Sequence, residues 1–309
     1  MVSIIIPYYN RPKKLQRAID SVFEQTFTDY EIIVVDDCSE IPPKTITDNR
    51  IAYLKNDENK GPGFSRNYGM SVAKGDYIVF LDTDDYWHKD FLKQVIAALK
   101  NNQEAIMAYA NGYYVNESGT AVEEMRLNAQ KLNTILPNIF IDGRPWGTAA
   151  CVWDRHRIKD VKWVDTRCWE DYVFDTSCAV ICNTVEFVDE ALVYYDMSND
   201  EFKLSAQKDF ESIEKNRNIS LLHISRLVAN SPFTKDQSLK QRLIHYAYSN
   251  AIALLKLGVK KKKYFKNLKA VIKSLGGKSN RMNITFLLNV ETKISLKLLR
   301  RLRQLNLQN

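Results

Sequence analysis

Cysteine is scarce in this sequence, and its spacing suggests neither cross-linking nor structural metal binding. The 309 residues contain five cysteines, an odd number, with no Cys-x-x-Cys pair. This usage argues against a disulfide framework or a zinc knuckle and fits the reducing cytoplasm, where we expect the protein to work. Cys178 and Cys182 are four residues apart and could share one helix face, but no histidine or third cysteine completes a metal site there.

Long hydrophobic runs are also missing. No stretch approaches the roughly 18 consecutive apolar residues of a membrane-spanning helix, which excludes an integral membrane protein. The first residues, Met1–Pro7, form a short apolar run with no basic flank before it, so they predict a β-strand rather than a signal peptide. Because 45% of the residues are hydrophobic and 26% are charged, a folded soluble protein is expected, not a disordered chain or a plain coiled coil.

Acidic residues are nearly absent from the last part of the chain. From Lys256 to the end there are 15 lysines and arginines against one acid, Glu291, although the whole chain carries a net charge of only +7. Residues 1–255 therefore carry a net charge of −7. Such a basic tail is typical of a segment that meets nucleic acid or an anionic membrane surface.

What the first part does contain is an alternation of strand and helix patterns. Apolar strand patterns occur at 2–7, 31–36, 51–54 and 77–81, and helical spacing occurs at 12–25, 63–73 and 89–100. Strands rich in Ile and Val that alternate with helices predict a parallel α/β sheet, whose ligands bind beyond the carboxyl ends of the strands. After Ser205 the pattern is helical throughout, so we place an α/β domain at 1–204 and a helical, basic region at 205–309.

The strongest candidate site is the sequence Phe-Leu-Asp-Thr-Asp-Asp at 80–85, directly after a predicted buried strand. Asp82 and Asp84 project to the same side of an extended chain, and three carboxylates this close repel one another without a cation. A hard cation such as Mg²⁺ or Mn²⁺, bound by few protein ligands plus substrate phosphates, suits this pattern. The alternative is a solvated acidic turn before the next helix.

Two further motifs fall at the same predicted sheet edge. Asp37, in Val-Val-Asp-Asp-Cys-Ser, could accept a hydrogen bond from a nucleobase N–H or a ribose hydroxyl, unless this segment is only a turn. Arg66 follows a Gly-Pro-Gly turn and could reach a diphosphate bidentately, although a surface arginine is the alternative. The glycine spacing matches neither a P-loop nor a dinucleotide-binding loop.

The fourth motif, Trp-Glu-Asp at 169–171, opens a predicted helix. Asp171 could serve as a general base, but acidic residues in a first helical turn also simply favour the helix dipole. Between these motifs, Trp146 lies in Gly-Arg-Pro-Trp-Gly and could either stack on a sugar ring or pack in the core.

Taken together, the ordered motifs resemble the family-2 inverting glycosyltransferases with the GT-A fold. The resemblance rests on Pro-x-Tyr-Asn at 7–10, then the motifs around Asp37, Arg66 and Asp84, then Trp-Glu-Asp, and covers about residues 1–195. It implies a Rossmann-like nucleotide-binding sheet flanked by helices. One departure concerns Asp196 and Met197, which stand where many relatives have a histidine.

The resemblance also implies a role for each matching residue. Asp37 would bind the nucleobase, usually uracil, in a pocket lined by the backbone of Pro7 and Tyr9. Arg66 would face the base and the phosphates, Asp84 would bind Mn²⁺ or Mg²⁺, Asp82 would touch ribose or sugar, and Asp85 would support them. Asp171 would be the catalytic base, with Glu170 contacting acceptor or donor.

The implied activity is inverting, metal-assisted transfer of a sugar from a nucleotide sugar, with a UDP-sugar favoured, to a hydroxyl of a glycan or a lipid-linked acceptor in cell-surface polysaccharide synthesis. A sugar-nucleotide pyrophosphorylase is the alternative enzyme, but it needs a Gly-rich basic loop where this chain has Pro7–Asn10. A nucleic-acid-binding module is disfavoured, because the basic tail contains few aromatic residues.

The segment 283–305 has leucine and isoleucine at helical spacing, with lysine and arginine on the remaining surface. Such a basic amphipathic helix is typical of peripheral attachment to an anionic membrane, here at the inner face of the cell membrane. Packing on the catalytic domain and helix-mediated self-association are the alternatives.

Overall fold

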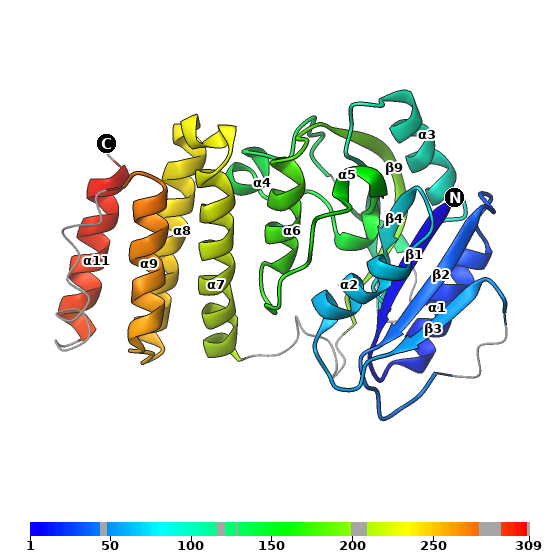
Figure 1. Cartoon of the computed structure of the whole chain (residues 1–309), viewed down its shortest axis with the longest axis horizontal. Helices are drawn as coiled ribbons and strands as arrows, with labels where there is room; N and C mark the ends of the chain where they lie inside the picture. The colour runs from blue at the N-terminus through cyan, green and yellow to red at the C-terminus, as the bar shows by residue number, and fades with distance from the viewer. Residues whose placement is uncertain (44–47, 116–120, 128, 199–208, 278–291, 308–309) are drawn as a thin grey trace. The chain divides into compact units, whose positions relative to one another are not determined.

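A computed structural model of the chain describes residues 1–43, 48–115, 121–127, 129–198, 209–277 and 292–307 (Figure 1). The chain forms two compact units, which are considered separately. The sheet unit comprises Met1–Ile135, Arg144–Asp165 and Ile181–Gln207, and the helical unit comprises Leu136–Gly143, Thr166–Val180 and Lys208–Asn309. The boundary predicted at 204–205 lies outside the described residues.

The sheet unit is built on one mixed sheet in the order β3-β2-β1-β4-β8-β6-β9-β5, with β7 paired to β6. Its strands are β1 (Val2–Tyr8), β2 (Tyr30–Asp36), β3 (Ile51–Lys55), β4 (Tyr77–Phe80), β5 (Asp85–Trp87), β6 (Met107–Val115), β7 (Ala121–Arg126), β8 (Cys151–Asp154) and β9 (Val185–Asp196). The prediction of a parallel sheet is confirmed for β1 to β4, whereas β8, β5 and β7 pair antiparallel to their neighbours.

The sequence has two short apolar strand patterns, at 184–188 and 191–195, and the structure joins them in one strand, β9. Its pairing with β6 is parallel, and the register shifts on both sides of Asn111. The sequence pattern missed this continuity because exposed Asp189 and Glu190 interrupt the apolar run at the irregularity.

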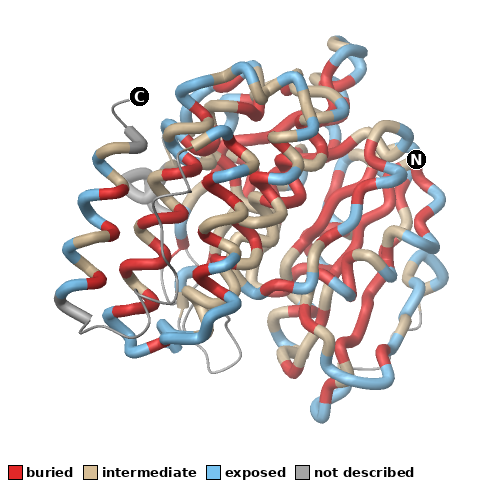
Figure 2. The backbone as a smooth tube through the Cα atoms, turned by 60° about the vertical axis from the view of Figure 1, so that its left-hand side comes forward, coloured by how far each residue is buried: buried red, intermediate tan, exposed pale blue. Residues whose placement is uncertain are grey.

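The central strands are buried because both their faces are apolar. In β1, Val2, Ile4, Ile5 and Ile6 are inaccessible to solvent, and Figure 2 shows buried backbone running through the central strands of the sheet. Removing such side chains from water is worth about 1.5–3 kcal/mol each. The polar residues that follow β2 and β4 therefore begin where this buried layer ends.

Three helices complete the framework around the candidate site. They are α1 (Pro12–Phe23), α2 (Pro62–Val72) and α3 (Phe91–Asn101), and short helical segments occur at η1 (Thr148–Ala150) and α5 (Arg155–Ile158). Helix α1 buries Leu15, Ala18, Ile19 and Val22, the i, i+3, i+4, i+7 spacing of one helix face, and begins with Pro12 in its first turn. The opposite face of α1 carries polar residues, among them Lys14 and Arg17.

The helical unit consists of α4 (Asn138–Ile141), α6 (Glu170–Ala179), α7 (Phe210–Ala229), η3 (Pro232–Lys235), α8 (Gln237–Lys256), α9 (Lys262–Ser274) and α11 (Thr292–Leu307). Helices α7, α8 and α9 pack against one another (Figure 1). Asp209 and Asp236 cap α7 and α8 by accepting hydrogen bonds from backbone N–H groups in the first turns. The helical character predicted for this region is confirmed where it is described.

Part of the apolar side of the predicted amphipathic segment 283–305 is used for packing, whereas Ile294 is exposed. Leu299 and Leu302 of α11 are buried, α11 contacts α8, and Arg303 reaches Ser249 of α8 at 3.4 Å. Residues 283–291 lie outside the described part of the chain. Among the described residues, none of the helices combines the length and the apolar character required to cross a membrane.

Candidate active site

The acidic motif forms the polar end of strand β4. Asp82, Thr83 and Asp84 follow this strand, and Asp85 begins β5. Two of its three carboxylates are paired with arginines: Nη2 of Arg66 lies 2.7 Å from Asp82 Oδ1, and Nη1 of Arg11 lies 3.3 Å from Asp84 Oδ2. The motif is thus not a freely solvated turn, since each of these carboxylates has a cation beside it.

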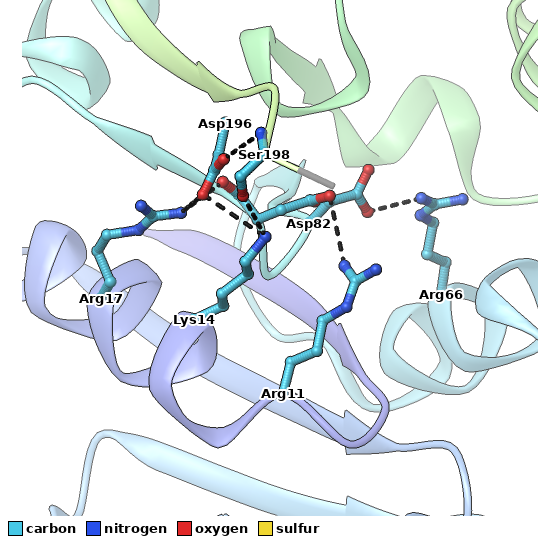
Figure 3. Close-up of polar contacts among 8 residues, drawn as sticks. Arg11, Lys14, Arg17, Arg66, Asp82, Asp196 and Ser198 are labelled. Carbon is cyan, nitrogen blue, oxygen red and sulfur yellow. Dashed lines mark hydrogen bonds and ion pairs between the residues drawn. The ribbon is translucent and has the colours of Figure 1, made fainter. Parts of the chain in front are cut away.

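Helix α1 supplies a row of basic side chains to this edge. Arg11, the residue just before α1, is followed by Lys14 and Arg17 at intervals of three residues, and Figure 3 shows all three extending toward the acidic motif and Asp196. Arg17 Nη2 donates to the Asp84 carbonyl at 2.9 Å and to Asp196 Oδ2 at 2.6 Å. The helix thereby fixes the ends of β4 and β9 beside each other.

Asp196 ends β9, in the segment where the sequence departs from the resemblance. Its carboxylate contacts Arg17 and lies 3.6 Å from Lys14 Nζ, and it accepts the Ser198 backbone N–H at 2.7 Å. Burial alone would raise the pKa of Asp196, but these hydrogen bonds and charges outweigh burial and hold its pKa at about 2. Asp196 is therefore a charged anchor for α1 in this structure.

Arg66 approaches the acidic motif from helix α2, opposite the α1 row in Figure 3. Its side chain is only 4% exposed, and its guanidinium lies over the ring of Trp163 at 4.3 Å. Nη2 binds Asp82, while Nε and Nη1 are buried without a hydrogen-bond partner among the described residues. Buried donors without partners are rare in folded proteins, so they indicate a place for an acceptor.

Asp37, at the end of β2, is held by neutral donors. Oδ1 accepts hydrogen bonds from Asn56 Nδ2 at 2.8 Å and the Lys60 backbone N–H at 2.9 Å, and Oδ2 accepts the Gly61 N–H at 2.7 Å. Gly61 has φ of +85°, a conformation that favours glycine, and it leads directly into α2. Since a carboxylate has about four lone-pair sites, one remains on Oδ2 for a further donor.

The same edge is closed by contacts between β1 and the loop after β2. Asn10, in the left-handed region with φ of +53°, accepts at Oδ1 the N–H groups of Glu40 and Ile41, both at 2.9 Å. The Tyr8 hydroxyl donates to the Ile41 carbonyl, and burial, with Asp36 nearby, raises the pKa of Tyr8 to about 12. Pro7 and Tyr9 flank this tyrosine at the end of β1, so the predicted pocket backbone lies at the same sheet edge as Asp37.

Trp146 is part of the core of the sheet unit. It is 3% exposed, and its ring lies 4.6 Å from that of Tyr109. Of the two alternatives for Trp146, this packing supports the core residue.

Glu170 and Asp171 belong to the helical unit, where they open α6. The residue before them, Trp169, adopts a left-handed backbone conformation with φ of +63°, which is strained for a bulky side chain. Its ring stacks on Tyr172 at 5.0 Å, meets Tyr246 edge-on at 5.1 Å and lies under Arg217 at 5.4 Å. Side chains from α6, α7 and α8 thus fix the turn that presents Asp171.

The oxygen donors at the end of β4 fit a hard divalent cation. Asp82 and Asp84 provide carboxylate oxygens, the donor type that Mg²⁺ and Mn²⁺ prefer, and the arginines beside them show that this edge attracts positive charge. Within the described ranges, no group of three or more His, Cys, Asp or Glu side chains is arranged to hold a metal. A cation here would therefore have few protein ligands, and substrate phosphates would complete its shell.

Several residues at this edge were missed by the sequence analysis. The row Arg11, Lys14 and Arg17 has a readable signal, because residues three apart share a helix face. Trp163 has no such signal, since it lies in an irregular segment, about a hundred residues after the helix that it contacts.

Comparison with protein-family models identifies the N-terminal part of the chain. Residues 3–153 match the model described as glycosyl transferase family 2. The match contains the segments around Asp37, Arg66 and Asp84 and ends before Trp-Glu-Asp.

Named relatives agree with this match. An uncharacterized glycosyltransferase of Methanocaldococcus jannaschii is 28% identical over 219 residues, covering 67% of this chain and 74% of its own. A UDP-Glc:α-D-GlcNAc-diphosphoundecaprenol β-1,3-glucosyltransferase of Escherichia coli is 37% identical over 122 residues, covering 38% of this chain. That alignment spans about half of the E. coli enzyme, 47%.

Solved structures extend the likeness in fold to the whole chain. Residues 1–349 of Staphylococcus aureus TarS, in complex with UDP-GlcNAc, superpose with a TM-score of 0.70 at 20% identity, covering 98% of this chain and 90% of that one. A mannosyltransferase from Pyrobaculum calidifontis, in complex with GDP-Man and Mn²⁺, gives a TM-score of 0.52 at 13% identity, covering 89% and 84%. From the family match, the named relatives and this fold, we conclude that the chain contains a family-2 glycosyltransferase domain, in a GT-A fold followed by a helical C-terminal region.

Proposed function

We propose that this glycosyltransferase transfers a sugar from a UDP-sugar, with inversion and with help from Mn²⁺ or Mg²⁺, to a hydroxyl of a glycan or lipid-linked acceptor in surface polysaccharide synthesis. The observation that carries the proposal is the end of β4, where Asp82 and Asp84 meet Arg66 and Arg11 at one sheet edge. Carboxylates for a metal and guanidiniums for phosphates are the groups that a metal–diphosphate complex requires. The names of the TarS complex and of the E. coli relative support the choice of donor and acceptor.

In this proposal the nucleotide sugar is bound by residues at the end of β2 and by residues at the end of β4. Asp37 accepts the N–H of the nucleobase with its remaining lone pair, beside the backbone of Pro7 and Tyr9. Arg66 donates its buried Nε and Nη1 groups to the diphosphate. Asp82 contacts ribose or sugar, and Asp85 supports the motif from the start of β5.

Asp84 is the proposed metal ligand, and Asp82 lies close enough in sequence to assist it. A bound divalent cation would neutralise the charge that develops on the leaving diphosphate. The chain itself contributes Arg66 to the same task, because a guanidinium in a water-poor site stabilises phosphate charge more strongly than it would in water.

Asp171 is the proposed general base. It removes the proton from the acceptor hydroxyl, whose oxygen attacks the anomeric carbon from the face opposite the leaving diphosphate. A single displacement of this kind inverts the anomeric centre and requires no enzyme nucleophile. Glu170, the residue before the base, is proposed to contact acceptor or donor.

The first experiment is a thermal-shift panel with UDP, GDP, dTDP, CDP and ADP, each with Mn²⁺ and with EDTA. A ligand at 100 times its dissociation constant stabilises the folded state by about 2.7 kcal/mol, a measurable shift. A shift with UDP that requires metal is the expected result and leads to a screen of UDP-sugars. If none of the nucleotides shifts the melting temperature, the acidic motifs are structural and the proposal is wrong.

The base assignment has its own test, Asp171→Asn. General-base help is worth roughly 10²–10⁴-fold, so transfer should fall by that factor while UDP binding is unchanged. Exposed Asp165, on the preceding loop, supplies the control Asp165→Asn, which should transfer at the normal rate. Normal turnover in Asp171→Asn would reject the assignment.

Membrane contact is proposed through charge rather than through inserted leucines. The exposed lysines of the α9 start, Lys261, Lys262 and Lys266, form no ion pair among the described residues, and the leucine side of α11 is packed on α8. Each basic residue near an anionic surface contributes about 1 kcal/mol. The protein should therefore co-sediment with anionic vesicles at low salt, and the triple change of these lysines to Gln should release it. Equal sedimentation with neutral vesicles would contradict the proposal.

A further inference from the structure

We call the sheet edge that carries Asp37, after β2, and Asp82 and Asp84, after β4, the donor edge. Arg66 is the most deeply buried positive charge there, and one aromatic side chain covers the face of its guanidinium. Its guanidinium carbon lies 4.3 Å from the ring of Trp163, and Arg66 and Trp163 are each 4% exposed. A cation over an indole face is attracted by about 0.5–2 kcal/mol, more when water is excluded. The contact therefore restricts the guanidinium to a plane above the ring.

Trp163 is itself fastened to the helix that carries Arg66. Asn67 Nδ2 donates to the Trp163 carbonyl at 2.8 Å, and the Trp163 backbone N–H donates back to Asn67 Oδ1 at 2.9 Å. At Gly63, one turn earlier in α2, an added Cβ would lie 2.8 Å from the Val164 carbonyl oxygen, so the segment packs directly on the helix backbone. Arg66 and Asn67 are adjacent in α2. The two hydrogen bonds between Asn67 and Trp163 therefore keep the indole in place beside the Arg66 guanidinium.

Trp163 also contacts the strand that leads to the acidic motif. The ring of Phe80, the last residue of β4, meets the indole edge-on, with centroids 5.1 Å apart and planes at 85°. Asp82, two residues further on, then binds Arg66 Nη2. The indole is thus packed between α2 and the end of β4, and both of its contacts lead to donor-edge residues.

This arrangement leaves two buried donors of Arg66, Nε and Nη1, with fixed directions and no partner in the described chain. An unmet buried donor costs about 1–3 kcal/mol, which an anionic oxygen would relieve. We propose that Trp163 is a positioning residue for the donor diphosphate: it holds the Arg66 guanidinium so that Nε and Nη1 meet phosphate oxygens. The inference rests on the proposed function, since it assumes a nucleoside diphosphate as the ligand.

The test compares UDP with uridine, which has the base and ribose but lacks the phosphates. In Trp163→Leu, UDP binding should weaken on the order of tenfold, while uridine binding stays within about twofold, because the two unpartnered Arg66 donors are proposed to meet phosphate oxygens, which uridine lacks. Trp163→Phe keeps an aromatic face and should recover most of the UDP affinity. In an Arg66→Gln background, Trp163→Leu should have no further effect on UDP binding.

The controls separate positioning from general damage. Trp153→Leu removes another buried tryptophan, on β8, and should lower the melting temperature while leaving the ratio of UDP to uridine affinity unchanged. If Trp163→Leu does not fold, Trp163→Met fills the space without an aromatic face and serves the same comparison. An unchanged UDP-to-uridine ratio in the folded Trp163 variants would overturn the inference, whereas failure of the unmodified protein to bind UDP would instead overturn the proposed function.

Discussion

The two ends of the donor edge hold their carboxylates in different ways. At the end of β2, Asp37 is bound by backbone N–H groups and an asparagine amide, all neutral and all from residues 56–61. At the end of β4, Asp82 and Asp84 are bound by the long charged side chains of Arg66 and Arg11. Backbone donors cannot leave without unfolding their loop, but an arginine can exchange one anion for another. We infer that the β2 end is a fixed structural element, whereas at the β4 end Arg11 releases Asp84 when a cation binds.

The comparison is tested most strongly at Asp84. Asp84→Asn should lower sugar transfer by roughly 10²–10³-fold, the scale of losing a group that stabilises developing charge. Stability should fall less than in Asp37→Asn, because the asparagine keeps a side-chain oxygen that can still accept from Arg11. Steady-state kinetics and thermal melting of the same samples check both halves. Asp90→Asn, at the start of α3, is the matched control, and a large stability loss in Asp84→Asn would erase the contrast with Asp37.

Asp37→Asn should behave in the opposite way. An amide places a donor against backbone N–H groups that need an acceptor, so the free energy of unfolding should fall by about 1–3 kcal/mol. Urea unfolding measures this loss, with Asp57→Asn as the control because Asp57 is an exposed carboxylate of the same loop. Unchanged stability would mean that the β2 end is no more fixed than the β4 end.

Arg11→Gln tests whether Arg11 and a metal compete for Asp84, because this change should improve Mn²⁺ binding but not UDP binding. Without the guanidinium at Asp84 Oδ2, Mn²⁺ binding in the absence of nucleotide should tighten a few-fold, consistent with a pair worth up to about 1 kcal/mol. UDP binding without metal should not improve. Calorimetric titration measures both, and Arg17→Gln serves as the control, since Arg17 donates to the Asp84 carbonyl and not to its carboxylate. Weaker Mn²⁺ binding in Arg11→Gln would show that the two cations do not compete.

The smallest expected effect concerns pH and Asp196. The pKa of this carboxyl is about 2, below its ordinary value of 3.8, so its contribution to stability is present above pH 4 and disappears as the pH falls toward 2. Asp196→Asn should therefore be less stable than the unmodified protein at pH 7, and the difference should shrink below pH 4. Urea unfolding across this range checks the sign, with exposed Asp20→Asn as the control. A difference that widens on acidification would contradict the pairing with Arg17.

Much of this architecture was predictable from local sequence, and the reason is physical. The strands around Ile4 and Ile33 are buried on both faces, so their apolar runs could be recognised without tertiary information, as could the acids that end β2 and β4. The pairing of β8 between β4 and β6 was not predictable, because a strand pattern does not state which neighbour it will have or in which direction. The parallel pairing predicted from the first hundred residues therefore holds for β1 to β4, whereas the antiparallel pairing of β8, β5 and β7 is visible only in the folded chain.

The candidate site likewise contains residues that could be predicted from sequence motifs and residues that could not. Asp37, Arg66 and Asp84 stand in motifs that occupy strand ends and a helix start, and the structure brings them to one edge. The contacts that hold them come from distant segments: Arg11 is 73 residues from Asp84, and Trp163 is 96 residues from Asn67. Periodicity and motif spacing report on neighbours in sequence, so partners at these separations become visible only in the folded chain.

The path of the chain between its two units has a practical consequence for protein engineering. Residues 136–143 and 166–180 are separated in sequence from Lys208–Asn309, yet they belong to the same unit, where α4 contacts α8 and α6 contacts α7. A chimera that joins this sheet unit to the C-terminal helices of another enzyme at a single splice point would therefore mismatch those contacts. A workable exchange must transplant three segments at once, and the second of them carries Trp-Glu-Asp. Such an exchange would therefore replace Asp171, the candidate base, with the corresponding residue of the other enzyme.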